Sequence, residues 1–264
     1  MGYEDMKAVF YTNKGCVRKT NEDALIVGGC AVCGTNMTAP SYIEIDADKE
    51  FFCVIDGMGG HFGGAVAARI TAQAFQTEEE PGEKPDNKIW LESILQRAYE
   101  GVLEAARCSP ELAGMGATLA GAVIDRGKKS IFAFNLGDCR VYRFQDGFLD
   151  KLTHDHSRVQ ELFDRGEITE EYGPAPRCEP YRIFRSRESS TIFHETMPIL
   201  RQSAGSRFWR SAKTLCCSGS VGFFVQRREG SIRKSFLPLM SSNFIVFATV
   251  VIRLTPLSSA ASIP

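Results

Sequence analysis

The sequence predicts an α+β protein in which helices cover antiparallel β-sheets. Two observations predict this class. Short runs of β-branched and aromatic residues occur in two groups, and two longer stretches with apolar residues at helical spacing lie between those groups. The predicted elements are strands at 8–12, 24–28 and 51–55, helices at 65–76 and 89–107, and strands at 117–124, 130–136 and 139–144.

Polar and turn-forming residues separate these elements. The proline-containing stretch TEEEPGEKPDNK divides the two helices, and Asp146-Gly147 is a strong hairpin signal before a further strand at 148–152. Ser157 is a capping residue for a helix over 156–165. Past about residue 172 the chain becomes Arg-rich and Ser-rich. The apolar stretch 236–254 is interrupted by polar residues, so a strand is favoured there over a membrane anchor.

The composition is that of an ordinary globular protein. Of 264 residues, 44% are hydrophobic and 24% are charged, and the length fits one large domain or two small ones. The net charge of -1 gives no basic surface for nucleic acid. Nine cysteines without a signal-like N-terminus indicate reduced thiols and a cytoplasmic location. We expect a monomer that binds neither nucleic acid nor membranes.

The cysteines at Cys30 and Cys33 have the spacing of half a zinc site. A zinc knuckle needs a second pair at similar spacing, and the adjacent Cys216 and Cys217 do not supply it. We therefore interpret Cys30 and Cys33 as two free thiols in a hairpin insertion.

Acidic residues occur at the ends of three predicted strands. Asp56-Gly57 ends the strand at 51–55, Glu22 and Asp23 precede the strand at 24–28, and Asp138 lies between two later strands. Each of these could be an ordinary turn. Together they fit a hard cation better, because Mg²⁺ and Mn²⁺ prefer carboxylates, backbone carbonyls and water.

These residue types are suited to phosphoryl transfer. Asp56 could bridge two ions about 3.5–4 Å apart while the unshielded Gly57 carbonyl ligates one of them, an arrangement that acidifies a shared water. Arg18 could hold phosphate oxygens through two parallel hydrogen bonds.

Five ordered motifs resemble the PPM family of metal-dependent protein Ser/Thr phosphatases, in its bacterial branch. They are GCVRKTNEDA, FCVIDGMGGHFGG, GATLAGAVI, FAFNLGDCRVYRF and KLTHDHSRVQELFDRGEIT, and they span roughly residues 5–171. The resemblance implies an αββα sandwich of two antiparallel β-sheets flanked by helices. It also implies two Mn²⁺ or Mg²⁺ ions, three in some members, and hydrolysis of phosphoserine or phosphothreonine without a phosphoenzyme. The implied substrates are proteins phosphorylated by a bacterial Ser/Thr kinase.

The resemblance also implies a role for each site residue. Asp56 looks like the bridging metal ligand, Gly57 the carbonyl ligand, Glu22 and Asp23 ligands of the metals or of their waters, and Asp138 the carboxylate of a looser third site. Arg18 looks like the phosphate binder. Met58 stands where many eukaryotic members have a histidine thought to act as general acid, and Cys139 stands where serine is usual. His61 receives no role, and we interpret Asp155 and His156 as structural.

The family pattern breaks in the last third of the chain. Gly219 stands where a strand-ending aspartate is expected, and Val246-Phe247 replaces an Asp-Asn pair before the last strand. Shifting the reading frame by one nucleotide in a back-translation of 176–182 and 217–223 restores family-like segments, the second with an aspartate. We therefore hypothesise that residues 172–247 are translated out of frame.

The sequence thus predicts residues 1–171 as the first two-thirds of a PPM domain and 172–264 as its divergent, incomplete remainder. With two carboxylates missing, the second metal ion should bind weakly, and the tail is expected to be poorly ordered. Two alternatives to an active phosphatase stay open. One is a phosphoprotein-binding domain without turnover, and the other is the inactive product of a damaged gene.

Overall fold

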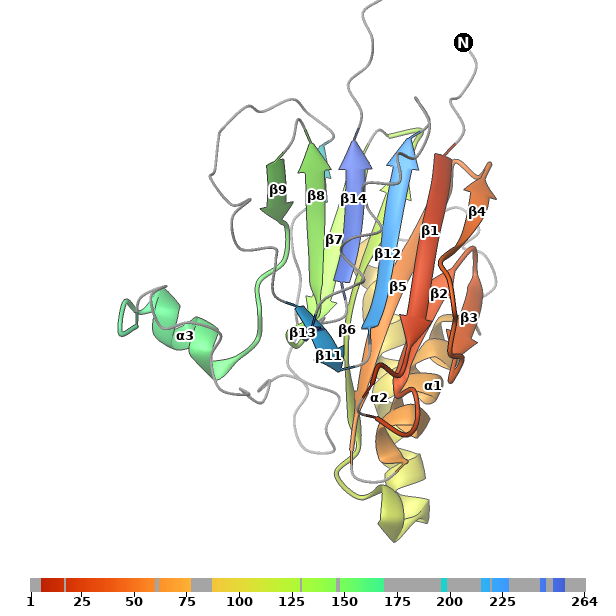
Figure 1. The fold of residues 1–264 in the computed structure, drawn as a ribbon, viewed down its shortest axis with the longest axis vertical. Helices are drawn as coiled ribbons and strands as arrows, with labels where there is room; N and C mark the ends of the chain where they lie inside the picture. The colour runs from red at the N-terminus through yellow and green to blue at the C-terminus, as the bar shows by residue number, and fades with distance from the viewer. Residues whose placement is uncertain are drawn as a thin grey trace, which may run out of the picture.

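Two six-stranded β-sheets stacked face to face form the body of the molecule (Figure 1). This computed structural model describes residues 6–16, 18–59, 62–76, 87–128, 130–145 and 148–168, together with five later strands. Sheet 1 contains, in spatial order, β4 (Ser41–Ile45), β1 (Met6–Asn13), β12 (Ser220–Arg227), β14 (Thr249–Leu254), β8 (Arg140–Gln145) and β9 (Phe148–Lys151). Sheet 2 contains β10 (Thr196–Pro198), β7 (Ser130–Leu136), β6 (Gly116–Asp125), β5 (Lys49–Met58), β2 (Asp23–Val27) and β3 (Cys30–Cys33).

The central strands of sheet 2 are buried on both faces because each face has its own core. Along β5, Phe52 and Val54 point into the cluster between the two sheets, whereas Cys53 and Ile55 point into the cluster beneath the helices. This alternation follows from the two-residue period of a strand. It explains why the sequence reads as a continuous apolar run there and not as an alternating one.

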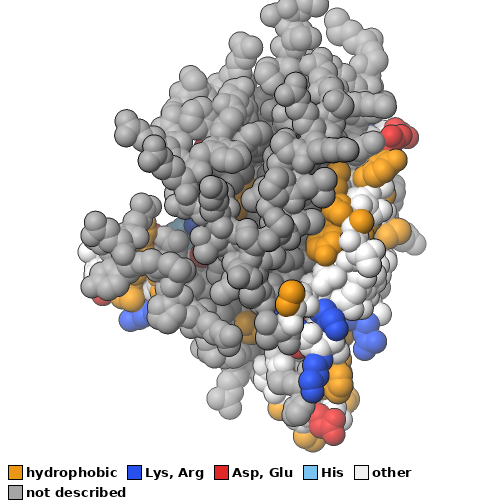
Figure 2. Space-filling model, viewed as in Figure 1, with side chains coloured by type: hydrophobic (Ala, Val, Ile, Leu, Met, Phe, Trp, Pro, Cys, Tyr) orange, Lys and Arg blue, Asp and Glu red, His pale blue; other side chains and the backbone are white. Residues whose placement is uncertain are grey.

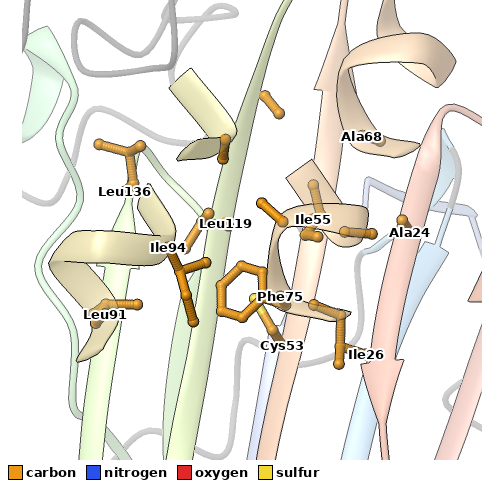
Figure 3. Packing of buried hydrophobic residues seen from close by; sticks show 14 of the residues in the cluster. Ala24, Ile26, Cys53, Ile55, Ala68, Phe75, Leu91, Ile94, Leu119 and Leu136 are labelled. Atoms are coloured by element: carbon orange, nitrogen blue, oxygen red, sulfur yellow. The ribbon is translucent and has the colours of Figure 1, made fainter. Parts of the chain in front are cut away.

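Helices α1 (Gly63–Gln76) and α2 (Asn87–Cys108) cover the outer face of sheet 2. Phe75 of α1 lies beside Cys53 of β5, and Leu91 and Ile94 of α2 belong to the same buried cluster (Figure 3). Fully burying one such side chain contributes about 1.5–3 kcal/mol, so this layer holds the helices on the sheet.

Smaller elements complete the described fold. A short 3-10 turn (Pro110–Leu112) follows α2, helix α3 (Arg158–Asp164) follows β9, and β11 (Leu215–Ser218) pairs with β13 (Asn243–Ile245). Helix α3 begins where expected, because the Ser157 hydroxyl accepts a hydrogen bond from the Gln160 amide at 3.3 Å. The bounds given above agree within a few residues at each end with every strand and helix predicted up to residue 165, so these predictions are confirmed.

Sheet 1 differs from a purely antiparallel sheet at its centre. β12 runs antiparallel to β1, but β14 pairs in parallel with both β12 and β8. Parallel neighbours need a long connection, and the chain between Arg227 and Thr249 is long enough to provide one. The α+β sandwich class is confirmed, with these two parallel pairings as its departure from the prediction.

Other expectations have mixed outcomes. Cys30 and Cys33 lie on β3, hydrogen-bonded to β2 in a hairpin, and both thiols are free, as predicted. β4 was not predicted, although Tyr42 to Ile45 alternate in polarity. The strand predicted within 236–254 is present as β14, and none of the described helices is long and apolar enough to cross a membrane. The Asp146-Gly147 turn and the predicted disorder of the tail concern residues outside those described.

Candidate metal centre

Strand pairing brings the predicted acidic residues to one end of sheet 2. β2 begins where β5 ends, and their antiparallel register places Asp23 directly opposite Asp56. The register is locked beside them, since the Gly57 amide donates a hydrogen bond to the Glu22 carbonyl at 3.1 Å. Residues 33 positions apart in the chain therefore become cross-strand neighbours.

Two carboxyl groups this close cannot both be ionised without a counter-charge. Burial, and next the neighbouring Asp56 carboxylate, raise the pKa of Asp23 well above its ordinary value. Burial also raises the pKa of Asp56 to about 6, an effect that the Arg18 guanidinium opposes. The two groups share a hydrogen bond, which means that in the metal-free protein one proton offsets their mutual repulsion. A divalent cation could offset it instead.

Glycines allow the backbone around Asp56 to close tightly. A Cβ atom on Gly57 would overlap the Gly64 carbonyl oxygen and lie 2.5 Å from the Glu22 carbonyl oxygen. A Cβ atom on Gly64, in the first turn of α1, would lie 2.8 Å from the Gly57 carbonyl oxygen. Only glycine fits at Gly57, so the end of β5, the start of α1 and the Glu22 backbone form one compact unit.

Arg18 and Glu22 form an ion pair in the loop that precedes β2. The arginine side chain is 37% exposed and the glutamate 16% exposed, so the guanidinium is reachable from solvent. Burial raises the pKa of Glu22, and the positive charge of Arg18 opposes that rise. Lys14 and Lys19 lie in the same loop, between β1 and β2 in Figure 1. Figure 2, drawn from the same side, shows several Lys and Arg side chains in that part of the surface.

Asp138 approaches the pair from the turn between β7 and β8. Gly137 adopts a φ of 95°, which turns the chain sharply after β7. Burial raises the pKa of Asp138, and its carboxylate in turn contributes to the raised pKa of Asp56. The described residues thus bring Asp23, Asp56 and Asp138 within electrostatic reach of one another.

These residues could supply part of the ligand set of a divalent-cation site. Asp23 and Asp56 fit a cation, because they are paired carboxyl groups with raised pKa values and the bare Gly57 backbone lies beside them. In the part of the chain that the structure describes, however, no three His, Cys, Asp or Glu side chains are grouped closely enough to hold a metal ion. His61 and Gly219 fall outside the described residues.

Sequence reasoning missed one polar neighbour of Asp56, Thr118, and did not place Cys139 beside it. Thr118 lies opposite Asp56 on β6, and its hydroxyl is 3.0 Å from the Cys139 sulfur. Both side chains are buried. Thr118, a polar residue in an otherwise apolar strand, was the available signal. The structural interpretation of Asp155 agrees with its geometry, since it forms a two-pronged ion pair with Arg140.

Comparison with known proteins identifies the family. Residues 41–172, half of the chain, match the family model described as protein phosphatase 2C. The chain belongs to the protein phosphatase 2C family. The resemblance seen in the five motifs is thereby confirmed.

This protein phosphatase 2C chain has bacterial relatives. It is 32% identical over 170 residues to the serine/threonine phosphatase stp of Listeria welshimeri, an alignment covering 63% of this chain and 61% of that protein. It is 31% identical over 213 residues to the serine/threonine protein phosphatase PstP of Mycobacterium tuberculosis, covering 79% of this chain and 35% of that protein. The chain thus spans about three-fifths of the Listeria relative.

Solved structures of the same family share the fold. The phosphatase PstP/Ppp of Mycobacterium tuberculosis superposes with a TM-score of 0.58 at 26% identity, covering 73% of each chain. The catalytic domain of PstP in complex with two manganese ions gives a TM-score of 0.57 at 25% identity, covering 74% of this chain and 73% of that one.

Proposed function

We propose that this chain is a Mn²⁺- or Mg²⁺-dependent protein phosphatase that hydrolyses phosphoserine and phosphothreonine. The observation that carries the proposal is the facing pair Asp23 and Asp56, two buried or half-buried carboxyl groups held opposite each other beside the Gly57 backbone. The solved PstP domain that contains two manganese ions supports the choice of cation.

Each site residue has a proposed task. A bound divalent cation supplies Lewis acidity and a water acidified to act as nucleophile near neutral pH. Asp56, Asp23 and the Gly57 carbonyl would hold it, with Glu22 as a ligand of metal-bound water and Asp138 at a looser site. Arg18 would exchange its ion pair with Glu22 for the phosphate oxygens of the substrate.

Two features of the sequence limit what the chain's own side chains can do in this reaction. The first leaves protonation of the leaving alcohol to solvent, and the second concerns the charge of the cations. Met58, half-buried at the end of β5, has no titratable group, so it cannot protonate the leaving alcohol. No aspartate stands at 219, so fewer carboxylates offset the charge of a second cation, which we expect to bind more weakly than the first. We include in the same proposal that Mg²⁺ can replace Mn²⁺ and that a third ion can bind.

The proposed substrates are proteins that a Ser/Thr kinase of the same bacterial cell has phosphorylated. Arg18, Lys14 and Lys19 offer positive charge on the loop beside the site, which favours the doubly charged phosphate group. We further propose that the protein acts as a monomer, away from nucleic acid and membranes, in the cytoplasm. The free thiols of the six described cysteines support a reducing compartment.

We also propose that residues 1–171 and 172–264 form one domain. The position of β12 and β14 between β1 and β8 supports this, because the late strands fill the centre of a sheet whose other members come early. The proposed frame change over 172–247 is tested by sequencing the locus. A clean sequence in which no alternative frame encodes an Asp-Gly pair contradicts it.

The phosphatase proposal is tested by hydrolysis of p-nitrophenyl phosphate with and without Mn²⁺. We expect turnover that requires Mn²⁺ and that Asp56→Ala abolishes. Asp125→Ala is the matched control, since Asp125 is a buried aspartate at the far end of β6, where it accepts a hydrogen bond from the Lys128 amide at 2.8 Å. Asp125→Ala should keep its Mn²⁺-dependent activity.

Other outcomes select the alternatives. Binding of a phosphopeptide without turnover, sensitive to Arg18→Ala, supports a phosphoprotein-binding domain. Aggregation of the unmodified chain supports the product of a damaged gene. Equal loss of activity in the Asp56 and Asp125 variants means that the effect is on folding, and contradicts the assigned role of Asp56.

A further inference from the structure

The turn that carries Asp138 is held from two sides by polar side chains that the proposed reaction does not use. We call Gly137, Asp138 and Cys139 the Asp138 loop. From β7, the buried Asn135 side-chain amide donates to the Gly137 carbonyl at 3.1 Å and to the Cys139 carbonyl at 3.4 Å. The same amide nitrogen lies 2.7 Å from the His154 carbonyl, which ties the loop to the segment 153–157.

His156 holds the loop from the opposite side. Its backbone amide donates to the Gly137 carbonyl at 2.8 Å, and its ring Nδ1 accepts a hydrogen bond from the Gly137 amide at 3.1 Å. Nδ1 must therefore be unprotonated, which makes this histidine a fixed acceptor. Both backbone groups of Gly137 thus have partners outside the loop.

Asn135 is poorly explained as a residue that serves packing alone. It is 3% exposed, and its Oδ1 atom is buried without a hydrogen-bond partner among the described residues. Burying an amide with an unsatisfied oxygen costs free energy, so an apolar residue would suit the interior of the sandwich better. The benefit of asparagine at this position is that its NH₂ group binds the carbonyls on both sides of Asp138.

The segment 153–157 also has attachments to β8 that do not involve Asn135 or His156. The Thr153 hydroxyl accepts from the Val141 amide at 3.0 Å, and Asp155 pairs with Arg140. Removing these contacts would loosen the segment as a whole. Removing the side-chain contacts of Asn135 or His156 would free the Asp138 loop while the Thr153 and Asp155 contacts still hold the segment on β8, so the two effects can be separated by mutation.

We propose that Asn135 and His156 are positioning residues that fix the Asp138 carboxylate toward Asp23 and Asp56. The proposal rests on the metal-ligand role proposed above for Asp138. A carboxylate on a free glycine turn would sample many orientations, and a cation would have to order it on binding. Groups that orient a metal ligand typically change metal affinity by 10- to 100-fold when they are removed.

The test uses the whole chain, two variants that remove contacts, one that keeps an acceptor and one control. His156→Leu and Asn135→Leu remove the side-chain contacts and leave the backbone hydrogen bond from the residue 156 amide to the Gly137 carbonyl, whereas His156→Asn keeps an acceptor near the position of Nδ1. Thr153→Val is the control, because it removes one buried hydrogen bond from the same segment without touching the Asp138 loop. Amide hydrogen exchange of Gly137 to Cys139 in EDTA reports on the loop, and titration of free Mn²⁺ by its paramagnetic resonance signal reports on affinity.

We expect loop amides in the two leucine variants to exchange faster in EDTA, and Mn²⁺ to bind about 10- to 100-fold more weakly. His156→Asn should restore most of both, and Thr153→Val should lower the melting temperature while leaving both unchanged. Unchanged loop exchange in His156→Leu and Asn135→Leu overturns the proposal. So does an equal loss of affinity in Thr153→Val.

The same experiment separates this proposal from the proposed function. Asp138→Asn provides the reference for the ligand role. If Asp138→Asn binds Mn²⁺ as tightly as the unmodified chain, Asp138 is not a ligand and the positioning role is overturned with it. If the unmodified chain binds Mn²⁺ but does not hydrolyse p-nitrophenyl phosphate, the phosphatase proposal fails, while loop exchange and affinity still test the roles of Asn135 and His156.

Discussion

Replacing Gly57 with alanine tests whether the close approach of β5 and α1 builds the site. The new Cβ atom would overlap the Gly64 carbonyl oxygen, lie 2.6 Å from its carbonyl carbon and lie 2.5 Å from the Glu22 carbonyl oxygen. All three are backbone atoms, so no side chain can rotate away. Either α1 moves away from β5, or the Gly57 peptide is displaced from its position at the end of β5.

The size of the effect follows from those distances. Ordinary contacts of a Cβ atom begin near 3.4 Å, so the backbone must shift by roughly 1 Å. Overpacking of this kind costs about 1–3 kcal/mol, which lowers the melting temperature of a chain of this size by about 2–12 °C. A displacement of 1 Å in a catalytic group can lower turnover by about 100-fold.

The assay compares thermal unfolding and Mn²⁺-dependent turnover in Gly57→Ala and Gly121→Ala. Gly121 lies on β6 away from the acidic residues, and a Cβ there would overlap the Phe52 carbonyl and lie 2.5 Å from the Phe134 ring. Both variants should lose stability, and only Gly57→Ala should lose metal-dependent turnover. A Gly57→Ala protein that melts and turns over like the unmodified chain refutes the reasoning.

Three further predictions concern charge and capping. Because the folded-state pKa of Asp56 is raised to about 6, its contribution to stability is complete below about pH 4 and is lost as the pH rises through 6. Urea unfolding in EDTA should therefore show roughly 1.4 kcal/mol more stability at pH 5 than at pH 7.5, because pH 5 lies about one unit below that pKa, and Asp56→Asn should remove most of that difference. Asp155→Ala leaves Arg140 without its carboxylate and should cost about 3 kcal/mol in the same assay, with Arg140→Met recovering part of the loss in the double variant. Ser157→Ala should cost about 1 kcal/mol and speed amide exchange in α3, while amides of α1 stay protected.

Local signals made the first part of the fold predictable. The strand at 51–55 was recognisable because both of its faces are buried, and Ser157 was recognisable because a cap needs only the three residues after it. The facing of Asp23 and Asp56 is different in kind. It depends on the register between β2 and β5, which composition and periodicity do not specify, and the resemblance to a family implied only that both residues belong to one metal centre.

The polar contacts around Asp138 lay beyond sequence reasoning for the same reason. Asn135 appeared as one polar residue in a strand, and His156 as part of a motif interpreted as structural. Their shared partner, Gly137, lies two positions from one and 19 from the other. β4 and the parallel pairing of β14 were likewise missed, because strand order is decided by contacts between segments more than 30 residues apart.

The position of β12 beside β1 has a consequence for synthesis on the ribosome. β1 ends at Asn13, yet its partner across the sheet begins only at Ser220. At about 5–20 residues per second, the first strand waits roughly 10–40 s for that partner to be made. Throughout that interval one edge of β1 has no partner strand, and an unpaired strand edge can pair with that of a neighbouring nascent chain. The yield of folded protein should therefore depend on chaperone supply and on translation speed between residues 13 and 220. Synonymous codon changes in that interval should alter the yield although the amino-acid sequence stays the same.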